Sequence, residues 1–320
     1  MSAASLYGSL LRLGFTAVGP REQRLQTLRG VALREGVVQD EAALSEGLAF
    51  AQRVPGPQTL AVAVWLGHRA GGLPGAMLAG ACYALPGVLL TILFASMVLV
   101  YRSTAQWPGV LKGVGAAATA LLLLTAWRTA GGAKATPPEV GVGLLTFGLV
   151  LVGAVLLGPS NPVEAGWTVN GRTLDADLAL LGVALALVTP GLAILSLTTY
   201  VGYLFGGVGW ALGVAAVALV PLLLPAVLAS RWEAPLLESP GARASVRFFH
   251  AASAGVMTAA AYLLARAAFW SGEPWHGRWP FLVILFAFVA GLRFRREAAT
   301  GLILVGGALL GFIAYAIFKA

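Results

Sequence analysis

The sequence predicts an all-α polytopic membrane protein with about ten transmembrane or partly re-entrant helices. Of its 320 residues, 58% are hydrophobic and only 11% are charged, whereas a soluble domain carries roughly 25% charged residues. Apolar runs long enough to cross a hydrocarbon core of about 30 Å follow one another, with short polar connections between them. Little polar sequence is left over, so we expect no soluble catalytic domain.

An internal repeat predicts that the helices form two related halves. At an offset of 135 residues, the Pro-Gly pair at 55–56 falls on the pair at 190–191, and the glycines that follow also match. A Pro-Gly pair removes a backbone donor and loosens a helix, so we expect one helix that breaks at membrane depth in each copy. Weaker matches at nearby offsets extend the repeat and predict halves at residues 1–137 and 138–320.

The apolar spans are bounded by proline and glycine residues. After the first span, four arginines between residues 21 and 34 predict a helix at the membrane surface. The second and sixth spans hold the two breaks, and Pro86 should kink or divide the third. The predicted spans are residues 5–19, 43–66, 74–101, 108–127, 140–158, 178–201, 210–229, 248–270, 279–292 and 299–318.

The formal charge of +8 comes mainly from basic residues in the loops that flank these spans. Such residues determine topology, so we predict no nucleic-acid partner. Arginines collect after the odd-numbered spans, so we predict that those loops lie in the cytoplasm. We expect a multi-pass protein of the cytoplasmic (inner) membrane. By this count the two Pro-Gly elements point the same way, although a re-entrant segment would reverse that result.

Several motifs together resemble the chromate transporter family, in its two-half, long-chain type. They are GFTAVGP at residues 14–20, VPGP at 54–57 with the glycines downstream, and TPG at 189–191 followed by YVGYLFGGVGWA. The second copy departs from the first in lacking its second proline. The resemblance implies a secondary active carrier that exports chromate, with sulfate as a further candidate and proton or ion coupling left open. The resemblance also implies that the two halves have opposite orientations in the membrane, whereas our span count gives them the same orientation. It adds Gly19 and Pro20 to the predicted substrate-binding residues.

A hydrated oxyanion that enters a membrane protein needs N–H donors, hydroxyl groups and a positive charge. The half-helix after Pro57 should present unpaired amides at the positive end of its dipole, and the half-helix after Gly191 should do the same. In the alternative interpretation, proline and glycine only permit close helix packing, and the hydroxyls bond back to their own helix. The substrate-binding residues predicted at the breaks are Arg53, Pro55, Gly56, Pro57, Gln58, Thr59, Pro190, Gly191 and Ser196.

Charged residues complete the predicted site. Arg53 directly precedes the first break and is our preferred positive charge, while Lys112 and His250 occupy equivalent positions in the two halves. Glu46 lies inside an apolar helical run and is the candidate for proton coupling. Alternatively, Glu46 lies at the membrane edge or pairs with Arg53.

The sequence contains no zinc-ligand spacing, P-loop, nucleophile elbow or dinucleotide-binding glycine pattern. We therefore predict no cofactor, no metal and no enzymatic activity. The expected partners are a small inorganic oxyanion, chromate or sulfate, and membrane lipid, with a homodimer left open. Two other functions remain as alternatives: a passive anion channel, and an integral membrane enzyme that acts on lipid.

Overall fold

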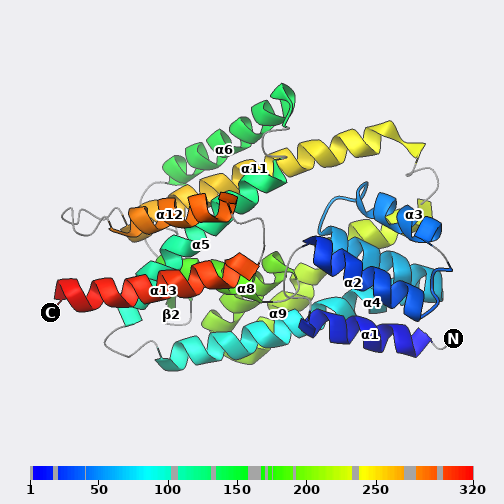
Figure 1. The fold of residues 1–320 in the computed structure, drawn as a ribbon, viewed down its shortest axis with the longest axis horizontal. Coiled ribbons are helices and arrows are strands. Elements are labelled where there is room, and N and C mark those ends of the chain that lie inside the picture. The colour runs from blue at the N-terminus through cyan, green and yellow to red at the C-terminus, as the bar shows by residue number, and fades with distance from the viewer. Residues whose placement is uncertain are drawn as a thin grey trace. The chain divides into compact units, whose positions relative to one another are not determined.

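The computed structural model describes residues 3–16, 21–39, 41–101, 107–130, 135–157, 167–169, 172–174, 176–189, 192–232, 238–269, 279–293 and 298–319. Figure 1 shows the elements in chain order. They are α1 (Ala3–Thr16), α2 (Arg21–Arg34), α3 (Glu41–Ala51), α4 (Gln58–Tyr101), α5 (Trp107–Thr129), α6 (Pro137–Leu157), β1 (Trp167–Val169), β2 (Arg172–Leu174), α8 (Ala176–Val188), α9 (Ala193–Ala229), η3 (Ser230–Trp232), α11 (Pro240–Phe269), α12 (Trp279–Arg293) and α13 (Ala298–Lys319).

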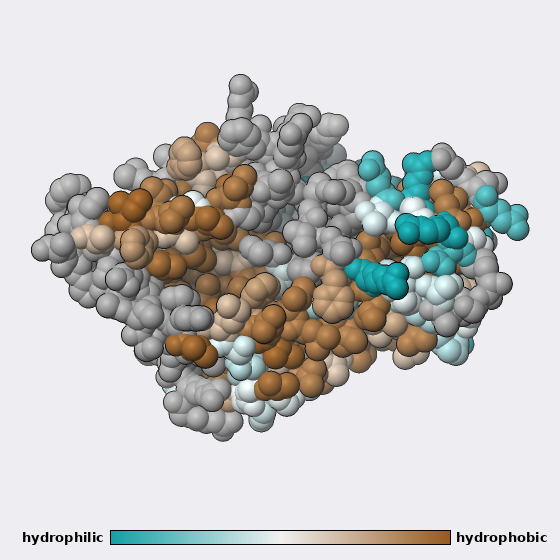
Figure 2. Space-filling model, turned by 60° about the horizontal axis from the view of Figure 1, so that its bottom comes forward, coloured by the Kyte–Doolittle hydropathy of each residue, from teal (hydrophilic) through white to brown (hydrophobic). Residues whose placement is uncertain are grey.

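The structure confirms the all-α class. Among the described residues, every regular element is a helix except the short antiparallel pair β1 and β2, which we did not predict. By length and composition, α4, α5, α6 and α9 could each cross a membrane. Figure 2 shows hydrophobic residues over much of the displayed surface. A surface of this kind is expected of a chain that faces lipid.

The chain divides into two compact units. Unit 1 consists of Met1–Leu93, Thr189–Tyr203 and Gly207–Val246, and unit 2 consists of Phe94–Val188, Leu204–Gly206 and Arg247–Ala320. This division differs from the repeat halves, because unit 1 takes α1 to α3 and most of α4 from the first half and most of α9 from the second. The start of α4 and the start of α9, which follow the two breaks, therefore belong to the same unit.

The first Pro-Gly element separates two helices that run in opposite directions. Helix α3 ends at Ala51 and α4 begins at Gln58. Glu46 in α3 pairs with Arg69 in α4, which brings the two helices back alongside each other. With 11 residues, α3 is about 17 Å long, roughly half of a hydrocarbon core. Residues 43–66 therefore form a helical hairpin, and the single crossing that we expected there is wrong.

A second reversal lies inside α4. The backbone is non-helical at residues 71–72, where Gly72 has a φ of 63°. Gly67 lies against the backbone of Gly75, eight positions further along, which a straight helix would place about 12 Å away. We call the two antiparallel arms α4a (residues 58–70) and α4b (residues 73–101).

Helix α9 repeats this folded shape at the offset of 135 residues. It begins at Ala193, the counterpart of Gln58, and Gly207, the counterpart of Gly72, has a φ of 71°. Gly202 lies against Trp210, as Gly67 lies against Gly75. The sequence repeat is therefore also a repeat of structure. We call the arms of α9 before and after the reversal α9a (193–206) and α9b (208–229).

The second break also follows the prediction as far as it is described. Helix α8 ends at Val188 and α9 begins at Ala193, so the helices stop and restart around the predicted element. Pro190 and Gly191 themselves lie outside the described residues. Of the kink or division expected at Pro86, the division is wrong, because the only non-helical dihedral angles inside α4 are at residues 71–72, and the kink stays a prediction.

Helix α4a is the centre of unit 1. Its side chains from Leu60 to Leu66 are at most 3% exposed, so the helix is buried on every side. Its neighbours in the core come from α1, α2, α3, α4b and α9, and include Leu6, Leu28, Phe50, Ala79 and Leu195. In Figure 1, the helices α1 to α3 lie beside α4 near the N-terminus.

Helix α5 has the corresponding place in unit 2, where it packs against α8, α12 and α13. Its middle is built of small residues, and Ala116, Ala117 and Ala118 are fully buried. At the crossing with α13, a Cβ atom added to Gly113 would overlap the carbonyl oxygen of Gly307. Small residues at such a crossing let two helix backbones approach closely.

Candidate functional site

The candidate site is the first break, where α4a begins. Gly56 has a φ of 126°, a conformation that glycine adopts without the cost of a Cβ atom. The first hydrogen bond of the helix runs from the amide of Ala61 to the carbonyl of Pro57, at 3.0 Å. The amides of Gln58, Thr59 and Leu60 therefore have no acceptor within the helix, and the positive end of the dipole lies there.

Arg53 lies in the same turn and has two relevant nitrogen atoms. Its Nη1 donates to the carbonyl oxygen of Ala49, at 3.0 Å, and so satisfies the last turn of α3. Its Nε is buried and has no hydrogen-bond partner within the described part of the chain. A buried donor on a cation is costly when it is unpaired. Arg53 thus closes α3 and retains one buried donor with no partner among the described residues.

The start of α9 has a similar but less polar arrangement. Leu192 precedes the helix in an extended conformation and provides no side-chain cap. The first helical bond runs from the amide of Ser196 to Leu192, at 2.9 Å, and the Ser196 side chain is buried. The hydroxyl groups of Thr198 and Thr199 both donate hydrogen bonds to the carbonyl oxygen of Leu195. For these two threonines the alternative interpretation holds, because the hydroxyls bond back to their own helix.

Glu46, the predicted proton-coupling residue, lies at the open end of the α3–α4a hairpin. Its carboxylate accepts a hydrogen bond from Arg69 at 2.9 Å, and the two side chains are 54% and 36% exposed. The Arg69 guanidinium also lies 4.6 Å from the ring centroid of the buried Trp65. Arg69 is therefore the ion-pair partner of Glu46, whereas we had considered Arg53.

The structure brings together only some of the predicted site residues. Unit 1 contains Glu46, the first-break residues from Arg53 to Thr59, and Ser196, with Thr59 only 5% exposed. Lys112 in α5 and His250 in α11 belong to unit 2, and both are half-buried. Gly19, Pro20, Pro190 and Gly191 lie outside the described residues. Within the described residues, no group of three or more His, Cys, Asp or Glu side chains could hold a metal.

Sequence reasoning missed Tyr83, which lies in α4b. Its side chain is fully buried, and its hydroxyl has no hydrogen-bond partner in the part of the chain that the structure describes. The neighbouring glycine, Gly14 of α1, packs so closely that a Cβ atom there would lie 2.6 Å from the carbonyl oxygen of Tyr83. The sequence feature that could have indicated this contact is the first glycine of the GFTAVGP run, because it permits the close approach of α1 to α4b.

Comparisons with known proteins agree on one family. A family model described as Chromate transporter matches residues 4–166 and again residues 162–312. A chromate transport protein of Cupriavidus metallidurans is 23% identical over 350 residues, which cover 86% of this chain and 84% of that protein. No solved structure matches.

Two further relatives match over shorter stretches. A probable chromate transport protein of Synechococcus elongatus is 31% identical over 114 residues, or 36% of this chain. An uncharacterized transporter of Methanocaldococcus jannaschii is 32% identical over 100 residues, or 31% of this chain. The matched stretches span only 28% and 24% of the lengths of these two relatives.

Proposed function

Because the chain belongs to the chromate transporter family, we propose that it is a secondary active transporter that exports chromate across the cytoplasmic membrane. The two matches of the family model support this proposal, since together they reach from residue 4 to residue 312. Sulfate is a second candidate substrate, because it is a tetrahedral dianion of the same charge. The observation that carries the proposal is the break at the start of the buried helix α4a.

The break exchanges water around the anion for fixed protein donors. The amides of Gln58, Thr59 and Leu60 point out of the helix end, and the dipole there favours an anion by up to about 2 kcal/mol in a partly buried site. The buried Nε of Arg53 adds a charged donor, and such a hydrogen bond contributes about 1.5–3 kcal/mol. Together these groups offset part of the cost of dehydrating the anion.

The second break contributes the other half of the proposed site. The start of α9a has free amides by the same geometry, and its buried Ser196 stands one turn into the helix. Both helix starts belong to unit 1 and contribute leucines to its one core. Paired broken helices from two repeats commonly form substrate sites in secondary transporters. Pro190, Gly191, Gly19 and Pro20 complete the proposed set, with Lys112 and His250 as further cations on the path.

Proton coupling is assigned to Glu46. Protonation would remove its charge and release Arg69, so that the open end of the α3–α4a hairpin would loosen. Glu46→Gln should therefore flatten the dependence of chromate flux on pH. Arg69→Gln is the matched control, because it breaks the same ion pair but keeps the carboxyl group. A Glu46→Gln protein with the wild-type pH profile would exclude this assignment.

The function is tested by flux into proteoliposomes under an imposed pH gradient. Chromate should accumulate above its external concentration, and sulfate should compete, whereas an unrelated monovalent anion should not. Arg53→Gln should lower the flux about tenfold, as the loss of one charged hydrogen bond predicts. Arg231→Gln, an exposed arginine of the same unit, should leave it unchanged. Flux that only equilibrates chromate would instead indicate a passive channel, and equal effects of the two variants would remove Arg53 from the site.

A further inference from the structure

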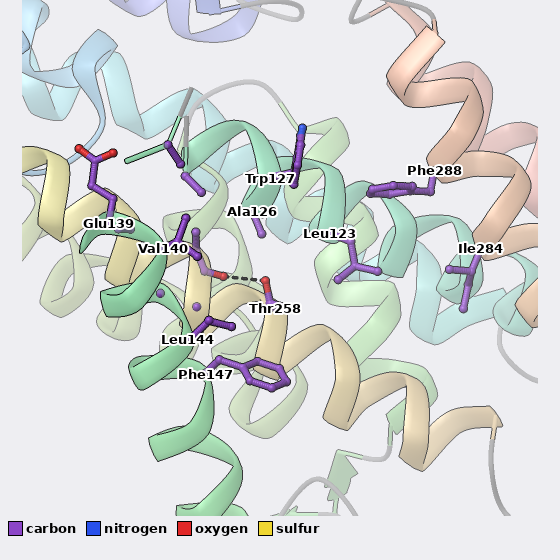
Figure 3. Close-up of a pocket in the computed structure, with 16 residues that line it drawn as sticks. Leu123, Ala126, Trp127, Glu139, Val140, Leu144, Phe147, Thr258, Ile284 and Phe288 are labelled. Carbon is purple, nitrogen blue, oxygen red and sulfur yellow. Dashed lines mark hydrogen bonds between the residues drawn. The ribbon is translucent and has the colours of Figure 1, made fainter. Parts of the chain in front are cut away.

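The buried hydroxyl of Tyr83 differs from the threonine hydroxyls of this fold. The buried Thr91 and Thr119 each donate to a carbonyl oxygen four residues back in their own helix, at 2.7 and 2.9 Å. Thr258 does the same at the pocket of unit 2 that Figure 3 shows. A tyrosine hydroxyl lies beyond its ring, too far from its own backbone for such a bond. When buried, it needs a partner from another element or from a ligand.

The register of the α4a–α4b hairpin places Tyr83 at the start of α4a. Gly67 of α4a packs against both Gly75 and Ala79 of α4b. Tyr83 follows Ala79 by one turn and lies on the same face of α4b, which is the face toward α4a. Because the two arms are antiparallel, this register puts Tyr83 opposite residues 59–63. Its fully buried side chain belongs to the same core as the first turn of α4a.

Helix α1 runs alongside α4b to the same level. A Cβ atom added to Gly75, near the reversal, would lie 3.0 Å from the hydroxyl oxygen of Tyr7. Two turns later in α1, Gly14 packs against the carbonyl oxygen of Tyr83. The turn before α4a holds Arg53, whose buried Nε, like the Tyr83 hydroxyl, has no hydrogen-bond partner among the described residues. Two buried donors therefore lie at the end of α4a where its first amides have no acceptor within the helix.

We propose that the Tyr83 hydroxyl donates a hydrogen bond to the oxyanion at the first break, an assignment that rests on the proposed function. A tyrosine hydroxyl can donate, and a hydrogen bond to an ionised acceptor is roughly twice as strong as one between neutral groups. A buried donor without a partner costs stability. In the absence of the anion, the hydroxyl should therefore destabilise the core of unit 1, and bound anion should remove that cost.

Thermal melting of the detergent-solubilised protein at increasing chromate concentrations tests this proposal. Tyr83→Phe removes the hydroxyl and keeps the ring. Without chromate, the variant should melt at the wild-type temperature or above it, because the lost donor has no protein partner. The Kd for chromate, obtained from the rise of the melting temperature with concentration, should increase about tenfold, as the loss of one hydrogen bond to a charged group predicts.

Tyr7→Phe is the matched control, because it removes a tyrosine hydroxyl of the same unit that lies near the reversal, at the other end of α4a. It should leave the Kd for chromate unchanged.

The outcomes separate this proposal from the proposed function. A Tyr83→Phe protein that melts below the wild type without chromate would overturn the proposal, because the hydroxyl would then have a partner in the protein. If Arg53→Gln weakens chromate binding and Tyr83→Phe does not, the site at the break stands and only the assignment of Tyr83 is rejected. If neither chromate nor sulfate raises the melting temperature of the wild type, the proposed function is rejected, and this assignment with it.

Discussion

The central helices of the two units are both largely buried but are built differently. In unit 1, α4a is buried through bulky side chains such as Trp65, and it starts at a break that leaves its first amides unpaired within the helix. In unit 2, α5 is buried through alanines and meets α13 backbone to backbone at Gly113. Burial alone therefore does not mark a binding site. The distinguishing feature of α4a is its start, whose first three amides have no acceptor within the helix.

The largest expected effect is on the α5–α13 crossing. Gly307→Leu should prevent folding or destabilise the protein by about 3 kcal/mol or more, because its Cβ atom would lie 2.6 Å from the carbonyl oxygen of Gly113. The yield of monodisperse protein and its melting temperature in detergent measure this effect. Gly306→Leu is the control, since a Cβ atom there meets nothing within 4 Å. Equal yields and melting temperatures for the two variants would show that α5 is not a packing helix.

The next effect separates the break from an ordinary turn. Gly56 and Gly72 both have positive φ and open space around a Cβ atom, so alanine at either position should cost about 1–2 kcal/mol. Only Gly56→Ala should also lower chromate flux, by about tenfold for a misplaced set of donors. Proteoliposome flux at matched protein levels measures the difference. Similar flux losses in both variants would mean that the break has no special role.

The smallest effect concerns the helices that surround α4a. The hydroxyl of Ser9 in α1 donates to Glu35 after α2, at 2.6 Å, and lowers the pKa of Glu35 below its ordinary 4.5, with help from Ser5, Arg34 and Arg12. A lowered pKa stabilises the fold above pH 4.5, and this contribution is lost as the pH falls through the folded-state value. Glu35→Gln should therefore show a smaller acid-induced drop in melting temperature than the wild type. Glu238→Gln, an exposed glutamate, should retain the full drop.

The sequence was sufficient to predict where the helices break. Proline and glycine act on the local backbone, so the stops at Ala51 and Val188 followed from the Pro-Gly pairs alone. The all-α membrane class was also predictable, since long apolar runs of sequence indicate membrane-spanning helices. The offset of 135 residues likewise predicted the matching starts of α4 and α9.

The path of the chain between the breaks was not predictable in the same way. Residues 43–66 have the length and composition of one crossing, and hydropathy does not distinguish a helix that faces lipid from one enclosed by protein. The reversal depends on the φ of Gly72 and Gly207, which a sequence match does not report. The pair of Glu46 with Arg69 exists only after the chain has reversed, so no local pattern indicated it.

The most direct test of the account is hydrogen exchange at the start of α4a, measured on the protein in lipid with and without chromate. If the anion binds at the break, the amides of Gln58, Thr59 and Leu60 should exchange about tenfold more slowly with chromate, as new hydrogen bonds to those amides predict. The amides in the middle of α5 should not change, and Arg53→Gln should abolish the slowing. Chromate that slows exchange elsewhere and leaves these three amides unchanged would contradict the account.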